Sequence, residues 1–208
     1  MKRPAPTDTL PPLEVDTILL HACCAPCSCA IVEALLAAKI TPVLFYYNPN
    51  IAPLEEYQKR KSECMRFATS RNLRMIDVDT PDRAADRRPW FDCVRGLENE
   101  PERGARCLEC FKMRLLRTAQ MARELGIKVF ATTLASSRWK DLSQIEVAGR
   151  LAEAQTGVRF WARNWRKGGL QQRRNELIKQ YNFYNQLYCG CLGAKPLEPP
   201  PPSASACD

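Results

Sequence analysis

The chain has 208 residues, of which 45% are hydrophobic and 26% are charged, and its formal net charge is +8. This composition is typical of one globular domain and argues against a membrane protein, because no apolar stretch approaches the roughly 18 residues that a transmembrane helix needs. The surplus of basic residues favours an anionic partner, nucleic acid above all, although a merely solvated basic surface would carry the same charge.

The two ends of the chain have the composition of tails. Residues 1–14 are proline-rich and lack the apolar core of a secretory signal, so we expect a flexible N-terminal tail and a cytoplasmic protein. Residues 195–208, "KPLEPPPPSASACD", predict a disordered, proline-rich C-terminal tail. A single folded domain is then expected over residues 15–194.

Strand-like and helix-like segments alternate along this domain. The expected strands are 17–22, 41–48, 73–80, 128–134 and 158–164, and the expected helices are 26–38, 54–71, 108–125, 140–155 and 171–185. A polar, arginine-rich insert at 81–106 follows the third strand. Alternation of this kind predicts right-handed βαβ units, and therefore an α/β domain whose mostly parallel sheet is flanked by helices.

Ligands of such sheets bind at the carboxyl ends of the strands. The segments "HACC", "YNPN" and "TTLASS" each follow an expected strand, so we expect them to meet at one edge of the sheet. The functional residues should lie there.

Three cysteine motifs account for most of the 11 cysteines. They are C-C-x-x-C at Cys23, Cys24 and Cys27, C-x-x-C at Cys107 and Cys110, and C-x-C at Cys189 and Cys191. The first two open expected helices, whose N-termini lower thiol pKa and favour the ligating thiolate. In the reducing cytoplasm such clusters indicate metal or redox chemistry rather than disulfides. With one histidine in the chain, the ligand types suit zinc or an iron–sulfur cluster, and the position at the functional edge favours the cluster.

The C-x-C pair differs in kind from the other two motifs. An oxidised Cys189–Cys191 pair would close a very small ring, and a constrained disulfide is easily reduced. The pair is therefore expected to be a redox couple or to bind a further metal. The alternative is that the two cysteines are simply buried in a turn and have no chemical role. Cys29, Cys64 and Cys93 are predicted to be structural, and Cys207 incidental.

Two kinds of side chain near the first cysteines are candidate proton donors. His21 ends the first strand beside Cys23, where it either satisfies a core hydrogen bond or donates a proton. Tyr46 and Tyr47 end the second strand. Because successive residues of a strand point to opposite faces, one of the two tyrosines should pack in the core.

Basic and aromatic side chains gather after the fifth expected strand. The basic residues are Arg163, Arg166, Lys167, Arg173, Arg174 and Lys179, and the aromatic ones are Trp161, Trp165, Tyr181, Phe183 and Tyr184. Cations bind phosphates and aromatic rings stack on unpaired bases, so this segment predicts an RNA-binding surface. Arg83, Arg87, Arg88 and Arg103 of the insert would extend it, whereas the alternative is a solvated basic helix.

Five segments together carry a family resemblance. "LLHACCAPCS", "YYNPNIAPLEEYQKRKSE", "GLENEPERGARCLECFKMRL", "FATTLASSRWKD" and "NWRKGG" with "FYNQLYCGC" resemble, in sequence and in order, the cobalamin-independent epoxyqueuosine reductases (QueH family) over about residues 17–194. The resemblance implies a Rossmann-like domain of the HUP (adenine nucleotide alpha-hydrolase-like) kind. It also implies removal of the epoxide oxygen of epoxyqueuosine in tRNA, the last step of queuosine biosynthesis, without cobalamin.

The resemblance also implies roles for particular residues. A [4Fe–4S] cluster would be held by Cys23, Cys24, Cys107 and Cys110. For the C-x-C pair two readings stay open: Cys189 and Cys191 are redox-active, or they bind an additional iron beside the cluster with Cys27. Catalytic roles are expected for Cys189, Cys191, His21 and Tyr47, and tRNA contacts for Arg163, Arg166, Lys167, Arg173 and Arg174.

The implied partners are tRNAs with GUN anticodons, those for aspartate, asparagine, histidine and tyrosine, and an external electron donor. Two other functions remain as alternatives. One is an iron–sulfur tRNA sulfur transferase of the ATP-pyrophosphatase type, although "HACCAPCS" has no glycine to cradle phosphate. The other is a zinc-stabilised tRNA-binding module without catalysis.

Overall fold

A computed structural model describes residues 14–186 and 188–191. The strands are β1 (Thr17–His21), β2 (Thr41–Tyr46), β3 (Met75–Asp77), β4 (Val129–Thr132) and β5 (Arg159–Phe160). They form one sheet in the order β3-β2-β1-β4-β5, and every neighbouring pair is parallel. The prediction of a Rossmann-like α/β domain is confirmed. Of the predicted tails, 1–14 and 195–208, all residues except Glu14 lie outside the described residues, Cys207 included.

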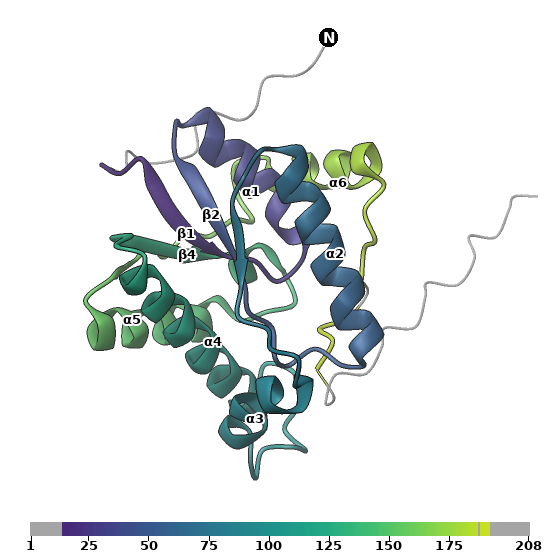
Figure 1. The fold of residues 1–208 in the computed structure, drawn as a ribbon, viewed down its shortest axis with the longest axis vertical. Helices are drawn as coiled ribbons and strands as arrows, with labels where there is room; N and C mark the ends of the chain where they lie inside the picture. Colours follow the sequence, from purple (N-terminus) through teal and green to yellow (C-terminus); the bar gives the residue numbers. More distant parts are fainter. Residues whose placement is uncertain (1–13, 187, 192–208) are drawn as a thin grey trace, which may run out of the picture.

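Helices cover both faces of the sheet (Figure 1). They are α1 (Ala25–Ala37), α2 (Leu54–Ser70), α3 (Arg83–Cys93), α4 (Ala105–Glu124), α5 (Leu142–Thr156) and α6 (Leu170–Tyr181), with a 3₁₀ turn, η2, at Thr133–Ser136. α1, α2 and α6 lie on one face, and α4 and α5 lie on the other (Figure 1). None of the helices in the described ranges is both long and apolar enough to span a membrane.

The central strand explains why the sheet is buried. Ile18, Leu19 and Leu20 of β1 are fully buried, because a parallel strand covered by helices on both faces requires a continuous apolar run. The strand order reverses beside β1, which lies between β2 and β4. Doubly wound sheets bind ligands outside the carboxyl ends of the strands at this reversal. His21 and Thr132, which are paired in register there, mark the position of the site.

The observed elements differ from the expected ones in four main places, of which the first is β3, with three residues instead of eight. The arginine-rich insert contains a helix, α3, which begins where the Asp82 carboxylate accepts hydrogen bonds from two backbone N–H groups. β5 has two residues instead of seven. α6 ends four residues early because Asn182 adopts a left-handed conformation, with φ of 49°, that closes the helix.

Gly149 of α5 allows the helix to lie against β5, and replacing it with alanine is expected to destabilise the fold. An added Cβ would lie 2.2 Å from two ring atoms of Phe160, which the packed core cannot absorb without moving that ring. We expect Gly149→Ala to lower the free energy of unfolding by about 1–3 kcal/mol, measured by urea denaturation. Val147→Ala, on the exposed side of the same helix, should change it by less than about 0.5 kcal/mol; equal effects would contradict the account.

Candidate functional site

Three thiols converge where β1 leads into α1. The sulfur atoms of Cys23, Cys24 and Cys27 all lie within 4.8 Å of one another, and those of Cys23 and Cys24 are 3.8 Å apart. Cys24 is the extended residue that precedes α1, and Cys27 lies in its first turn, so the change from strand to helix brings the motif together. The spacing suits thiolate ligands of a metal centre.

Neighbouring segments hold these thiols in place. The Thr133 hydroxyl accepts a hydrogen bond from the Cys23 N–H at 3.1 Å and donates one to the Cys23 sulfur at 3.4 Å. The Gln186 amide donates to the Cys24 sulfur at 2.6 Å. Hydrogen bonds from the thiols of Cys24 and Cys27 hold the pKa of Cys23 well below its usual range. Cys23 is therefore the member of the three that is most readily ionised.

The second motif lies at the start of α4. Cys107 and Cys110 are three residues apart and therefore project from one side of the helix. Burial raises the pKa of both thiols. Cys110 packs in a small cluster with Cys191, and Cys93 lies against the same cluster. Cys93, which we expected to be purely structural, thus lies beside two candidate ligands.

The C-x-C motif crosses the same edge of the sheet. The Arg60 guanidinium donates to the carbonyl groups of Tyr188 and Cys189 at 3.2 and 2.9 Å. Gly190 has a φ of 92°, and an added Cβ would lie 3.0 Å from the Arg60 side chain, so the turn requires glycine. Arg60 and Gly190 together fix the C-terminal cysteines against α2.

Lys140 links the C-x-C pair to the other motifs. Its ammonium lies 3.3 Å from the Cys189 sulfur and donates a hydrogen bond to it. Burial alone would lower the pKa of Lys140, but the negative charges of Cys189 and Cys23 outweigh that effect and raise it. Conversely, the hydrogen bond from Cys191 and the positive charges of Lys140 and Arg114 hold the pKa of Cys189 well below its usual range.

The first cysteine motif and the C-x-C motif open into one cavity of about 520 Å³. Cys23, Cys27 and Cys189 line it. Its wall also contains six cationic side chains and one carboxylate, that of Glu102; the cations are Arg60, Arg114, Arg138, Lys140, Arg166 and Arg174. A cavity with this excess of positive charge attracts an anionic ligand to the thiols.

The structure shows His21 in the first of its two expected roles, that of a core hydrogen-bonding residue. Its Nε2 lies 3.2 Å from the Tyr47 carbonyl and its Nδ1 lies 2.9 Å from the Thr132 hydroxyl. The ring is fully buried, and that burial, with the charge of Arg114, lowers the pKa to about 3. This neutral imidazole joins the ends of β1, β2 and β4 through hydrogen bonds at both nitrogens. Its single N–H proton is used in one of these bonds and is not available to a substrate.

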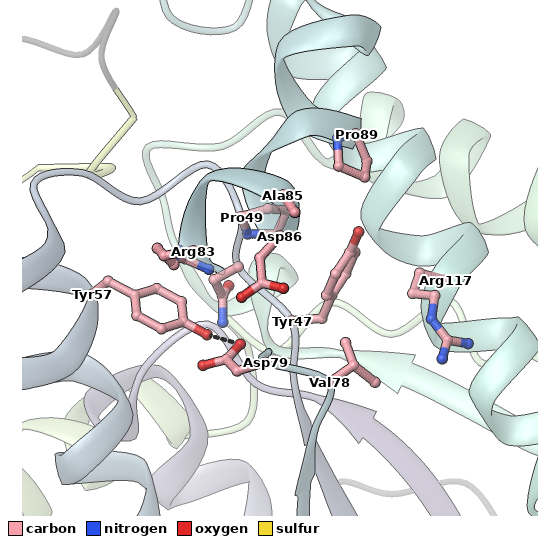
Figure 2. Close-up of a pocket in the computed structure, with 11 residues that line it drawn as sticks. Tyr47, Pro49, Tyr57, Val78, Asp79, Arg83, Ala85, Asp86, Pro89 and Arg117 are labelled. Carbon is pink, nitrogen blue, oxygen red and sulfur yellow. Dashed lines mark hydrogen bonds between the residues drawn. The ribbon is translucent and has the colours of Figure 1, made fainter. Parts of the chain in front are cut away.

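The two tyrosines occupy different places. Tyr46 is fully buried and its hydroxyl donates to the Tyr57 carbonyl at 3.2 Å, which confirms that one of the pair packs in the core. Tyr47 faces a second cavity, where its ring stands between Asp86 and Arg117 (Figure 2). No described cysteine lines that cavity, so Tyr47 does not lie among the thiols as we expected for a catalytic residue.

The basic segment divides into residues at the cavity and residues outside it. Arg166 and Arg174 line the cavity, whereas Arg163 and Lys167 do not. Arg166 donates to the carbonyl groups of Ser137 and Lys140, which fixes the loop that carries Lys140.

Part of the aromatic set is not available for stacking on bases. Trp165 is 1% exposed and donates from its indole to the Thr132 carbonyl at 3.0 Å, and Phe183 is 6% exposed. Both pack in the core because α6 and the segment around it cover the sheet. The expectation that these two rings bind unpaired bases was wrong.

Several residues of the site were not assigned from the sequence. Thr133, Lys140, Arg114, Asn48 and Gln186 all contact a cysteine or line its cavity. Lys140 and Thr133 belong to the segment "FATTLASSRWKD", whose position after a strand was recognised without assigning its individual side chains.

Comparison with known proteins agrees with this geometry. The model of the family described as "Epoxyqueuosine reductase QueH" matches residues 18–195. Proteins of that name from Histophilus somni and Acinetobacter baylyi are 49% and 46% identical to the chain, over 85% and 87% of it and 71% and 81% of their own lengths. The one from Thermotoga maritima is 38% identical, over 86% of the chain and 90% of its own length.

Proposed function

The chain belongs to the epoxyqueuosine reductase QueH family, and we propose from this premise that its thiol-lined basic cavity reduces epoxyqueuosine within tRNA. The family is one of oxidoreductases of queuosine biosynthesis, which favours this reading over the sulfur transferase and the non-catalytic zinc module. The observation that supports the site most directly is a single cavity that combines Cys23, Cys27 and Cys189 with six cationic side chains.

The donor set fits an iron–sulfur centre. Seven thiols from three motifs lie along one edge of the sheet, and all-thiolate sites are typical of such clusters. In the proposal, Cys23, Cys24, Cys107 and Cys110 hold a [4Fe–4S] cluster, and Cys27, Cys189 and Cys191 hold an additional iron. When bound, the cluster would supply electrons singly and the iron would polarise a carbon–oxygen bond.

The remaining residues of the cavity position the substrate and balance charge. Loss of the epoxide oxygen as water consumes two electrons and two protons, so the cavity must tolerate transient negative charge. Lys140 and Arg114 supply permanent positive charge beside the thiols. Lys140 Nζ, which carries protons at the cavity wall, is the group best placed to hydrogen-bond the departing oxygen.

The partner in this proposal is a tRNA with a GUN anticodon, and an external donor supplies the electrons. A tRNA substrate and thiolate ligands both suit a reducing compartment, so the proposal includes a cytoplasmic enzyme. The modified base has to turn out of the anticodon loop to reach the thiols, while phosphates of the loop contact cations at the rim. Arg138 and Arg174 suit that role because they line the cavity and carry no carboxylate partner among the described residues.

The proposal predicts turnover by the isolated protein. Chain reconstituted anaerobically with iron and sulfide should convert epoxyqueuosine in tRNA to queuosine when a chemical reductant is present. Mass spectrometry of the digested nucleosides would show the loss of one oxygen atom. An iron-loaded protein that binds the tRNA and leaves the epoxide intact would contradict the proposal.

Arg173 and Arg174 are expected to differ although they are adjacent. Arg173 is held in a two-point ion pair by Glu33 of α1 at 2.7 and 2.9 Å, so Arg173→Gln should lower the free energy of unfolding by about 1 kcal/mol. Among the described residues, Arg174 donates hydrogen bonds only to amide oxygens. Arg174→Gln should therefore weaken tRNA binding instead, and flatten its salt dependence by about 0.7 in log–log slope. Urea denaturation tests the effect on stability, and tRNA binding at several salt concentrations tests the effect on affinity. If the two variants weakened tRNA binding equally, the distinction between Arg173 and Arg174 would be refuted.

A further inference from the structure

A second cavity, of about 330 Å³ (Figure 2), adjoins the cysteine cavity, with which it shares a lining residue. It forms where the chain leaves β2 and β3 and where α3 begins, and Tyr57 of α2 and Arg117 of α4 complete its wall. Its volume is at the lower end of the range for small-molecule sites and suits a single ring system. Neither the fold nor the thiol chemistry explains this cavity.

One side of the second cavity is flat and largely apolar. The Tyr47 ring is stacked against Phe45 with a centroid separation of 5.9 Å and an interplanar angle of 13°, which fixes its orientation. Pro49, Val78 and Pro89 lie around it (Figure 2). Proteins hold the faces of unpaired bases on aromatic surfaces of this kind.

The opposite side carries hydrogen-bond donors that no acceptor of the described residues satisfies. The Arg83 guanidinium lies 3.5 Å from the centroid of the Tyr57 ring, and its Nε and Nη2 atoms are buried with no hydrogen-bond partner among the described residues. Unpaired buried donors are costly, and in native structures each calls for an explanation. A ligand in the cavity that carries an acceptor would provide it.

The carboxylates of the wall are already occupied. Asp79 accepts hydrogen bonds from the Tyr57 hydroxyl and from Lys61, and Asp86 accepts them from the Thr80 backbone and hydroxyl. Their charges offset those of Arg83 and Arg117, so a strongly anionic ligand gains little here. The preferred ligand is a flat, neutral ring that bears carbonyl oxygens, as uracil-like and guanine-like bases do.

Asn48 is the one described residue that lines both cavities. Its amide donates to the Ala22 carbonyl at 2.9 Å and its oxygen accepts from Arg114, so it forms a fixed partition. We propose that the second cavity binds an unpaired, carbonyl-bearing base next to the nucleotide whose base enters the cysteine cavity. This inference rests on the proposed RNA substrate and adds a second base-binding site to it.

The test compares variants on matched RNAs. Arg83→Met removes the unpaired donors and keeps much of the side-chain volume, and Ala85→Trp fills the cavity from the exposed start of α3 without removing a donor. Arg95→Gln, which alters an exposed arginine paired with Asp92, is the control. The RNAs are an anticodon stem-loop with epoxyqueuosine and two versions that lack the base immediately before or after it. Fluorescence anisotropy with the reconstituted enzyme gives the dissociation constants.

Both cavity variants should weaken binding of the intact loop about tenfold, and the control should not. One of the two RNAs lacks the base that occupies the second cavity. This RNA should bind the wild type more weakly by a similar factor, and it should bind the wild type and the variants equally. Equal losses on all three RNAs, or none, would overturn the proposal. The proposal would also be overturned if the Arg83 variant lost binding of free uridine monophosphate but bound the stem-loop as the wild type does, because the ligand would then be a free nucleotide. A wild type that binds the loop without reducing it contradicts the proposed function and not this site.

Discussion

Replacing Cys23 with serine is expected to remove bound iron and to lower the turnover of epoxyqueuosine in tRNA by more than about 100-fold. Loss of a residue that only supports a metal ligand typically costs 10–100-fold, and loss of the ligand should cost more. Cys23 is the one thiol of its motif whose pKa is lowered, and its sulfur lies within 4.8 Å of two others. Iron and sulfide assays with single-turnover kinetics measure the two losses together.

Cys29→Ser is the matched control for this change. Cys29 lies in the same segment, but its thiol points to the Pro26 carbonyl at 3.4 Å and does not belong to the three-thiol group. Serine can keep that hydrogen bond, so iron content and activity should stay near wild type. A Cys23→Ser protein that retains both would remove Cys23 from the metal centre.

Replacing Lys140 with methionine is expected to lower turnover by about 100- to 1000-fold while iron content stays near wild type. The ammonium contacts the Cys189 sulfur and lines the cavity, yet it is not itself a metal ligand. Methionine keeps much of the side-chain volume and removes the charge. Turnover under saturating tRNA, with iron content measured on the same sample, separates the two effects.

Lys128→Met is the control for charge loss, because Lys128 is exposed at the opposite end of β4. It should leave turnover unchanged. If Lys140→Met also lost iron, Lys140 would serve the assembly of the centre rather than the reaction. Unchanged turnover would remove it from the mechanism.

The sequence was sufficient to predict the sheet and the edge at which the site lies. β1 is an apolar run with the length of a strand, and helices between successive strands predict that the strands are parallel. The cysteine motifs could be located because their spacing is local. What joins them is not local: Lys140, Arg60 and Gln186 reach the thiols from distant segments.

The expectations that the structure changed or narrowed share a physical cause. Tyr47 and His21 sit at strand ends, where the sequence period shows alternation but not which face meets the thiols. Trp165 and Phe183 lie among basic residues, so their burial depends on how α6 docks against the sheet. Arg173 is adjacent to Arg174, yet only the fold shows that Glu33 compensates its charge.

Mössbauer spectroscopy of iron-57-labelled protein, combined with sulfide and zinc analysis, tests the central claim most directly. The claim is that thiols of three separate motifs form one iron–sulfur centre in a basic RNA-binding cavity. The account predicts the spectrum of a [4Fe–4S] cluster, with acid-labile sulfide, and a separate iron signal that disappears when Cys189 and Cys191 are replaced by serine. Anaerobically purified protein that contains stoichiometric zinc and no sulfide, and that does not take up iron and sulfide on reconstitution, would contradict it.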